Sequence, residues 1–162
     1  MNNNKVKYVL LSVILAILPL MAQKEIVVDL YQQKAYALED GNIVFEGKIS
    51  SGMLGRDTPE GDYRILQKKR QHRSNLWPKP NGGAKMPYML RLTNSGIAMH
   101  LGNTSRRAAS HGCIRMNNGF AQKMFKWAKV GTIVHVDGSA QNYNNITSSD
   151  CASDYMVIDF HD

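Results

Sequence analysis

The sequence predicts a mainly β fold, a sandwich or barrel-like sheet with one main helix packed against it. Short apolar runs separated by turn residues recur between residues 26 and 100, as they do in small β domains. One segment, after residue 116, carries apolar residues at the three-to-four spacing of a helix. The sequence contains no internal repeat and no sign of a second domain. These observations favour a single domain in which one sheet and one helix share a core.

The expected strands follow one another with short connections. They cover residues 26–30, 35–38, 43–49, 62–66, 88–92, 97–100 and 132–136. The Asp40-Gly41 pair between the second and third strands predicts a hairpin. Residues 51–61 and the basic segment 67–86 are expected to be loops, and a loop as long as the second is usually functional or mobile.

The single helix is expected directly after the segment that contains Cys113. Asn117 or Asn118 is suited to cap its first turn, and Gly131 is suited to end it. Its apolar stripe runs through Phe120, Met124, Trp127 and Ala128. A stripe of this kind predicts core packing rather than a cofactor site.

The N-terminus predicts an export signal over residues 1–22. Lys5 and Lys7 precede an apolar run, residues 9–22, that ends in Ala22, a residue suited to a cleavage point. The run has 14 residues, fewer than the about 20 that a spanning helix needs, so no stable membrane span is expected after cleavage. An uncleaved anchor is the alternative. Residues 23–137 then form the domain, and residues 138–162 form a C-terminal extension to which the sequence assigns no role.

The charge of the chain points to anionic partners outside the cytoplasm. The formal net charge is +7 at pH 7. An exported basic domain favours an anionic cell-wall polymer or a membrane face. Nucleic acid is disfavoured, because no nucleic-acid-binding motif occurs in the sequence. The expected location is the periplasm or the cell-wall space.

The most informative segment is Ser110-His111-Gly112-Cys113-Ile114-Arg115. It places a cysteine beside an imidazole, a guanidinium and a glycine, which is the setting of an activated nucleophile. The cationic neighbours are expected to lower the pKa of the Cys113 thiol. No Asp or Glu occurs between Asp62 and Asp137, so the general base should be a histidine oriented by a backbone carbonyl.

The spacing alone leaves several alternatives open. His100, at the end of a predicted strand, and His111, two residues before the cysteine, compete for the role of base. Cys113 could instead form a disulfide with Cys151, since both would lie in an oxidising compartment. His100, His111 and Cys113 could bind zinc, although their spacing matches no common zinc motif and Arg115 would repel the ion. We expect neither a metal nor a cofactor.

Four segments in order resemble the L,D-transpeptidase catalytic domain, a family of bacterial cell-wall enzymes. These segments are 26–33, 58–63, 86–88 with 96–100, and 110–116 with Asn118. The interval from His100 to Cys113 is 13 positions, shorter than in many members of the family. Arg106 and Arg107 stand in this interval where a neutral turn is usual, which bears on donor and acceptor preference more than on chemistry.

The resemblance implies a cysteine enzyme that acts on peptidoglycan stem peptides. Cys113 would attack the bond after the third residue of a tetrapeptide stem, expel D-alanine and pass the acyl group to an amine. His100 would be the base. Backbone N–H groups of His111, Gly112 and Cys113 would form the oxyanion hole, with Ser110 in the same loop. Arg115 would order the site or meet a substrate carboxylate, and Tyr88 would line the groove.

Three other functions remain compatible with these residues. A hydrolase, such as an L,D-carboxypeptidase, an endopeptidase or an amidase-type enzyme, would use the same Cys-His site with water as the acceptor. A cell-wall-binding module could keep the fold without catalysis, although it would have no need for a reactive thiol. A secreted effector that acts on the wall of a rival is the third, and no feature of the sequence supports it.

Overall fold

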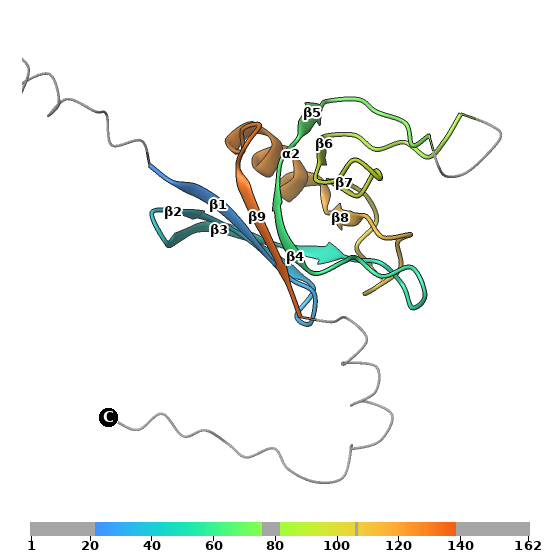
Figure 1. Ribbon diagram of the computed structural model, residues 1–162, viewed down its shortest axis with the longest axis horizontal. Helices are drawn as coiled ribbons and strands as arrows, with labels where there is room; N and C mark the ends of the chain where they lie inside the picture. Colours follow the sequence, from blue (N-terminus) through green and yellow to red (C-terminus); the bar gives the residue numbers. More distant parts are fainter. Residues whose placement is uncertain (1–21, 76–81, 106, 139–162) are drawn as a thin grey trace, which may run out of the picture.

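The computed structural model describes residues 22–75, 82–105 and 107–138 (Figure 1). It confirms the mainly β prediction: in these residues nine strands form one curled sheet and a single helix, α2, packs against it. No helix within the described ranges is both long and apolar enough to cross a membrane. The expected signal peptide, apart from Ala22, and the C-terminal extension beyond Gly138 lie outside the described residues.

The elements follow the predicted order. They are β1 (Lys24–Asp29), β2 (Lys34–Glu39), β3 (Asn42–Ser50), β4 (Gly61–Arg64), β5 (Gln67–Lys69), β6 (Met89–Arg91), β7 (Ala98–Leu101), β8 (Ile114–Met116), α2 (Asn118–Trp127) and β9 (Ile133–Asp137).

The sheet has the strand order β4-β9-β1-β2-β3-β8-β7-β6-β5. Its two halves meet at the long strand β3, which pairs with β2 over most of its length and with β8 at Ile49 and Ser50. The predicted hairpin at Asp40-Gly41 is present between β2 and β3, and both residues have positive φ. β7 and β8 run parallel, so the chain that leaves the end of β7 must cross back to the end of the sheet where β7 begins before it enters β8. That crossover contains the nucleophile candidate.

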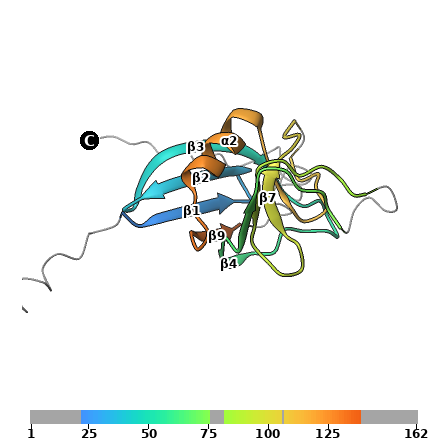
Figure 2. The same ribbon diagram turned by 90° about the horizontal axis from the view of Figure 1, so that it is seen from above.

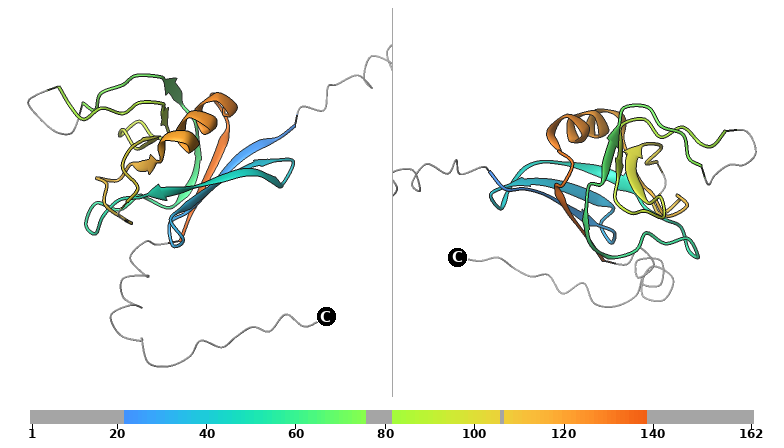
Figure 3. Two further views of the ribbon diagram at one scale, coloured as in Figure 1. Left: turned by 180° about the vertical axis from the view of Figure 1, so that it is seen from behind. Right: turned by 45° about the horizontal axis from the view of Figure 1, so that its top comes forward.

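Helix α2 covers the concave side of the sheet (Figures 2 and 3). Its N-cap is Asn117, whose side chain accepts a hydrogen bond of 3.0 Å from the N–H of Phe120, and it ends at Trp127, before Gly131. Phe120 packs directly on Gly47 of β3, where a Cβ atom would lie 2.2 Å from the ring. Phe45 meets Phe120 and Trp127 edge to face, at ring distances of 6.0 and 5.5 Å. The predicted core face of the helix is confirmed.

Two short strands were not predicted. β5 lies at the start of the segment expected to be a loop and pairs with β6, and β8 lies within the motif around Cys113. Beyond β5, residues 70–75 and 82–87 run side by side as an irregular arm, joined by backbone hydrogen bonds from Ser74 to Ala84 and from Met86 to His72 (Figure 1). The basic segment is therefore folded back beside the sheet over its described parts.

Candidate active site

Parallel strands β7 and β8 bring the predicted site residues together. His100 lies in β7 beside Arg115 of β8 in the strand register, and Cys113 immediately precedes β8. The three side chains line one cavity of about 400 Å³. Because sheet pairing fixes the backbone of β7 and β8, the geometry of this cluster depends on the core rather than on a mobile loop.

The cavity lies between the arm, the turn before β7 and the crossover loop. The residues that line it are Arg56, Ser74, Ala84, Lys85, Met86, Ser95, Gly96, Ile97, His100, Leu101, Gly102, Ser110, His111, Cys113 and Arg115. Three of them carry a fixed positive charge, and this lining contains no carboxylate side chain. The cavity therefore favours a substrate that carries negative charge.

His100 is buried and is oriented by the backbone. Its Nδ1 lies 2.8 Å from the carbonyl oxygen of Leu101. A carbonyl only accepts hydrogen bonds, so Nδ1 donates and Nε2 keeps a lone pair. Burial lowers the pKa of His100, and the charge of Arg115 acts in the same direction, whereas the bond to Leu101 opposes it. The ring is therefore neutral at pH 7, with Nε2 able to accept a proton.

Cys113 carries a free thiol, and its Sγ donates to the carbonyl oxygen of Gly96 over 3.8 Å. The expectation of a lowered thiol pKa is wrong. Burial raises the pKa of Cys113 above its ordinary value, because the loss of water around a thiolate outweighs the backbone of Ala98 and the charge of Arg115. The resting site thus pairs a neutral thiol with a neutral imidazole, and a base is needed to activate the sulfur.

The loop that carries Cys113 is held by hydrogen bonds on both sides. Ser110 is buried, its N–H donates to Ser51 O at 2.9 Å, and its hydroxyl donates to Cys113 O. Gly112 has φ +99°, a conformation that other residues rarely adopt. Its carbonyl oxygen accepts a hydrogen bond of 2.9 Å from the hydroxyl of Thr58.

The other predicted residues, His111, Arg115 and Tyr88, differ in their position relative to the cavity. His111 is exposed at the cavity rim, where burial and the nearby Arg56 and Arg115 lower its pKa. Arg115 packs its aliphatic part over Gly102 and lines the cavity. Tyr88 is not brought into the cavity: its ring meets Phe125 of α2 edge to face at 5.6 Å. Its predicted role in lining the groove therefore finds no support in its position.

Three further residues belong to the site and were not singled out from the sequence. Arg56 and Lys85 add positive charge to the cavity from the loop after β3 and from the arm, and Thr58 supports the Cys113 loop. The richness of residues 67–86 in Lys and Arg was a signal for Lys85. Thr58 begins the segment 58–63 that resembles the family, but no pattern in the sequence indicated its contact with Gly112. Arg56 carried no signal.

The described residues give no support to the two alternatives for Cys113, a zinc site and a disulfide with Cys151. Within the described ranges, no group of three or more His, Cys, Asp or Glu side chains is arranged to hold a metal ion. His100, His111 and Cys113 therefore do not form a zinc site there. Cys151, the partner in the alternative disulfide, lies outside the described residues.

The family model described as the L,D-transpeptidase catalytic domain matches residues 23–136. A search of curated proteins found no match.

Several solved structures with similar folds are described as L,D-transpeptidases. One from Stackebrandtia nassauensis has 27% identity and a TM-score of 0.64, and the match covers 73% of this chain and 57% of that one. L,D-transpeptidase 1 of Mycobacterium tuberculosis has 25% identity and a TM-score of 0.60, with coverage of 72% and 62%. L,D-transpeptidase 3 of the same organism, solved with a faropenem-derived adduct, has 22% identity and a TM-score of 0.63, with coverage of 72% and 61%. The chain thus spans about three fifths of the length of these proteins.

Proposed function

The chain belongs to the L,D-transpeptidase catalytic-domain family, and on this premise we propose that it is a cysteine L,D-transpeptidase acting on peptidoglycan stem peptides. The family acts on the cell wall, which places its work outside the cytoplasm. The observation that carries the proposal is the shared cavity of Cys113, His100 and Arg115, in which a backbone carbonyl orients the imidazole.

The proposed reaction begins from the neutral pair. Nε2 of His100 accepts the proton of the Cys113 thiol as the sulfur attacks the carbonyl carbon of the third residue of a tetrapeptide stem. Backbone N–H groups of residues 111–113 stabilise the oxyanion. The intermediate then collapses: the carbon–nitrogen bond breaks, protonated His100 returns the proton to the leaving amine, and D-alanine departs. The stem remains as a thioester on Cys113.

Transfer completes the cycle. The amine of a neighbouring stem attacks the thioester carbonyl and loses a proton to His100. The carbon–sulfur bond then breaks, and His100 returns the proton to the sulfur, which regenerates the thiol. Arg115 lies beside the reacting pair and is suited to bind the carboxylate of the departing D-alanine, with Arg56 and Lys85 favouring further carboxylates of the substrate. His111, exposed at the rim, acts through its backbone rather than as the base.

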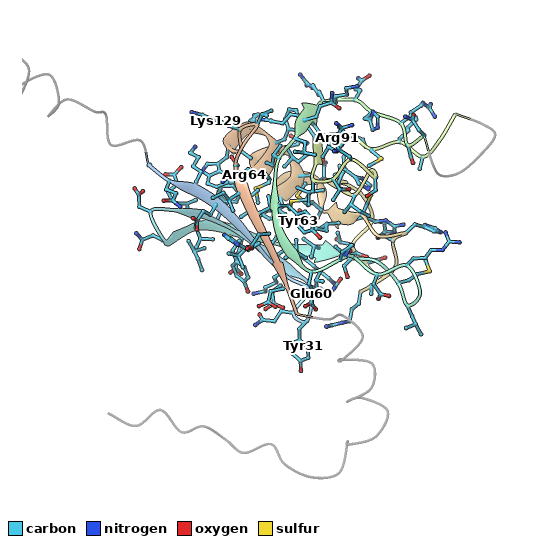
Figure 4. All side chains as sticks on the ribbon, in the orientation of Figure 1. Tyr31, Glu60, Tyr63, Arg64, Arg91 and Lys129 are labelled. Carbon is cyan, nitrogen blue, oxygen red and sulfur yellow. The ribbon has the colours of Figure 1, made fainter. Side chains whose placement is uncertain are left out.

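The charge distribution supports a second, anionic partner. No Asp or Glu stands between Asp62 and Asp137, so all charged side chains of β5–β8, α2 and the arm are basic. A second cavity, which shares Lys85 with the first, is lined by Lys69, Gln71, His72, Arg73, Lys85 and Pro87. Figure 4 shows Arg91 near β5 and β6, at the opposite end of the molecule from Glu60. We propose that this concave basic surface binds an anionic cell-wall polymer and draws the enzyme to its substrate.

Hydrolysis is the second candidate function, because water can replace the amine at the same thioester. The test is to incubate the purified chain with stem-containing wall fragments and to identify the products by mass. Cross-linked dimers indicate transfer and shortened stems indicate hydrolysis. Untouched fragments that are retained by the protein would instead indicate a binding module and would contradict the proposal. Export by the segment 1–22 is tested separately, by N-terminal analysis of the protein recovered outside the cytoplasm.

A further inference from the structure

The hydroxyl of Thr58 joins two loops at the back of the nucleophile. Its Oγ1 accepts a hydrogen bond of 2.9 Å from the N–H of Gly52 and donates one of 2.9 Å to the carbonyl oxygen of Gly112. Thr58 is 5% exposed, so water does not readily substitute for either bond. One side chain therefore ties residues 52–58 to the peptide unit that precedes Cys113.

The surroundings of Gly52 restrict the loop that carries Thr58. A Cβ atom on Gly52 would lie 2.1 Å from Arg56 O and 2.6 Å from the N of Thr58, so the loop closes tightly over its backbone. The N–H of Met53 in turn donates to Ser110 O at 3.0 Å, and Gly52 forms a parallel bridge with Ser110. The loop is thereby fixed against the crossover at two points, and the Thr58 hydroxyl is presented from a rigid base.

The peptide unit that Thr58 holds is one that would supply an oxyanion donor in the proposed reaction. A peptide bond is planar and trans, so the carbonyl of Gly112 and the N–H of Cys113 belong to one rigid plane and point in opposite directions. Any contact that fixes the carbonyl also fixes the direction of the N–H. Glycine, here at φ +99°, has more backbone freedom than other residues, and an external contact is needed to select one orientation.

We propose that Thr58 is a positioning residue for acylation: its hydroxyl holds the Gly112 carbonyl so that the N–H of Cys113 faces the oxyanion formed when the thiol attacks. This inference rests on the proposed function, because it requires an acyl-transfer site at Cys113. Thr58 does not touch the substrate, and it does not act on the thiol or on His100. It therefore affects the stabilisation of the oxyanion and leaves the reactivity of the sulfur unchanged.

The test separates these two properties in the full-length chain. Acylation of Cys113 by a carbapenem passes through an oxyanion, whereas alkylation by iodoacetamide does not. Both second-order rates are measured for the unmodified enzyme and for Thr58→Val, which keeps the shape and removes both hydrogen bonds. Thr58→Ser, which keeps the hydroxyl, is the matched control. Loss of one oxyanion donor lowers rates about 10²–10³-fold, so its misalignment in Thr58→Val should lower acylation about 10–100-fold.

The expected result is slow acylation with alkylation within about 2-fold of the unmodified enzyme, and near-normal values of both rates for Thr58→Ser. The proposal is overturned if Thr58→Val acylates normally, if both rates fall together, or if Thr58→Ser behaves like Thr58→Val. Should Thr58→Val fail to fold, Thr58→Ala replaces it, since alanine and serine differ by the hydroxyl alone. Failure of the unmodified enzyme to be acylated at all would count against the proposed function instead.

Discussion

The protonation state of the resting site gives the sharpest prediction. Burial raises the pKa of Cys113 above that of an ordinary thiol and lowers the pKa of His100 below that of an ordinary imidazole. An ordinary thiol is about 3% ionised at pH 7 and an ordinary imidazole is about three quarters neutral. Both shifts therefore leave the thiol mainly protonated and the imidazole mainly neutral at pH 7. A thiol whose pKa is lowered, which is the expectation from the sequence, would instead be largely ionised at pH 7.

Alkylation by iodoacetamide distinguishes the two states, because it reports thiolate directly. We expect the rate at pH 7 to be about 3% or less of its alkaline plateau and to rise about 10-fold per pH unit, up to a midpoint above that of an ordinary thiol. The Cys151→Ser background removes the second thiol from the measurement. Since the charge of Arg115 lowers the pKa of Cys113, Arg115→Gln should move the midpoint further up, whereas Arg115→Lys should not. A rate at pH 7 within about 2-fold of the plateau would refute the neutral pair.

The remaining predictions concern single positions. His100→Ala should lower acylation about 10²–10⁴-fold through loss of the base, and His111→Ala should lower it much less; the reverse order would reassign the base. Gly112→Ala forces a side chain into φ +99° with its Cβ 2.9 Å from Ile97, and should slow acylation and lower the melting temperature. Phe120→Ala should destabilise the fold by about 3–5 kcal/mol, as measured by urea unfolding, because the ring fills the space over Gly47.

Much of the fold follows from local sequence. Short apolar runs and the Asp40-Gly41 turn predict β1, β2 and β3, and the spacing of Phe120 and Met124 predicts the core face of α2. β5 and β8 were missed because each has three residues, too few for a period to show. Gln67–Lys69 has no apolar residue at all, and its strand conformation depends on pairing with β6.

The candidate site was predicted as a set of residues and less well as a chemical environment. Cys113, His100 and Arg115 stood out because their side-chain types are unusual beside a glycine, and the structure brings them to one cavity. The raised thiol pKa could not be predicted, because burial of the sulfur depends on residues from other strands. Thr58 lies 54 positions from Gly112, and its contact exists only after the sheet has formed.

The most direct test of the central claim is the mass of the acyl-enzyme formed with a tetrapeptide stem. The account predicts a covalent adduct on Cys113 that equals the tripeptide acyl group, release of free D-alanine, and neither product from Cys113→Ala. An adduct on another residue, or D-alanine release that persists in Cys113→Ala, would contradict it.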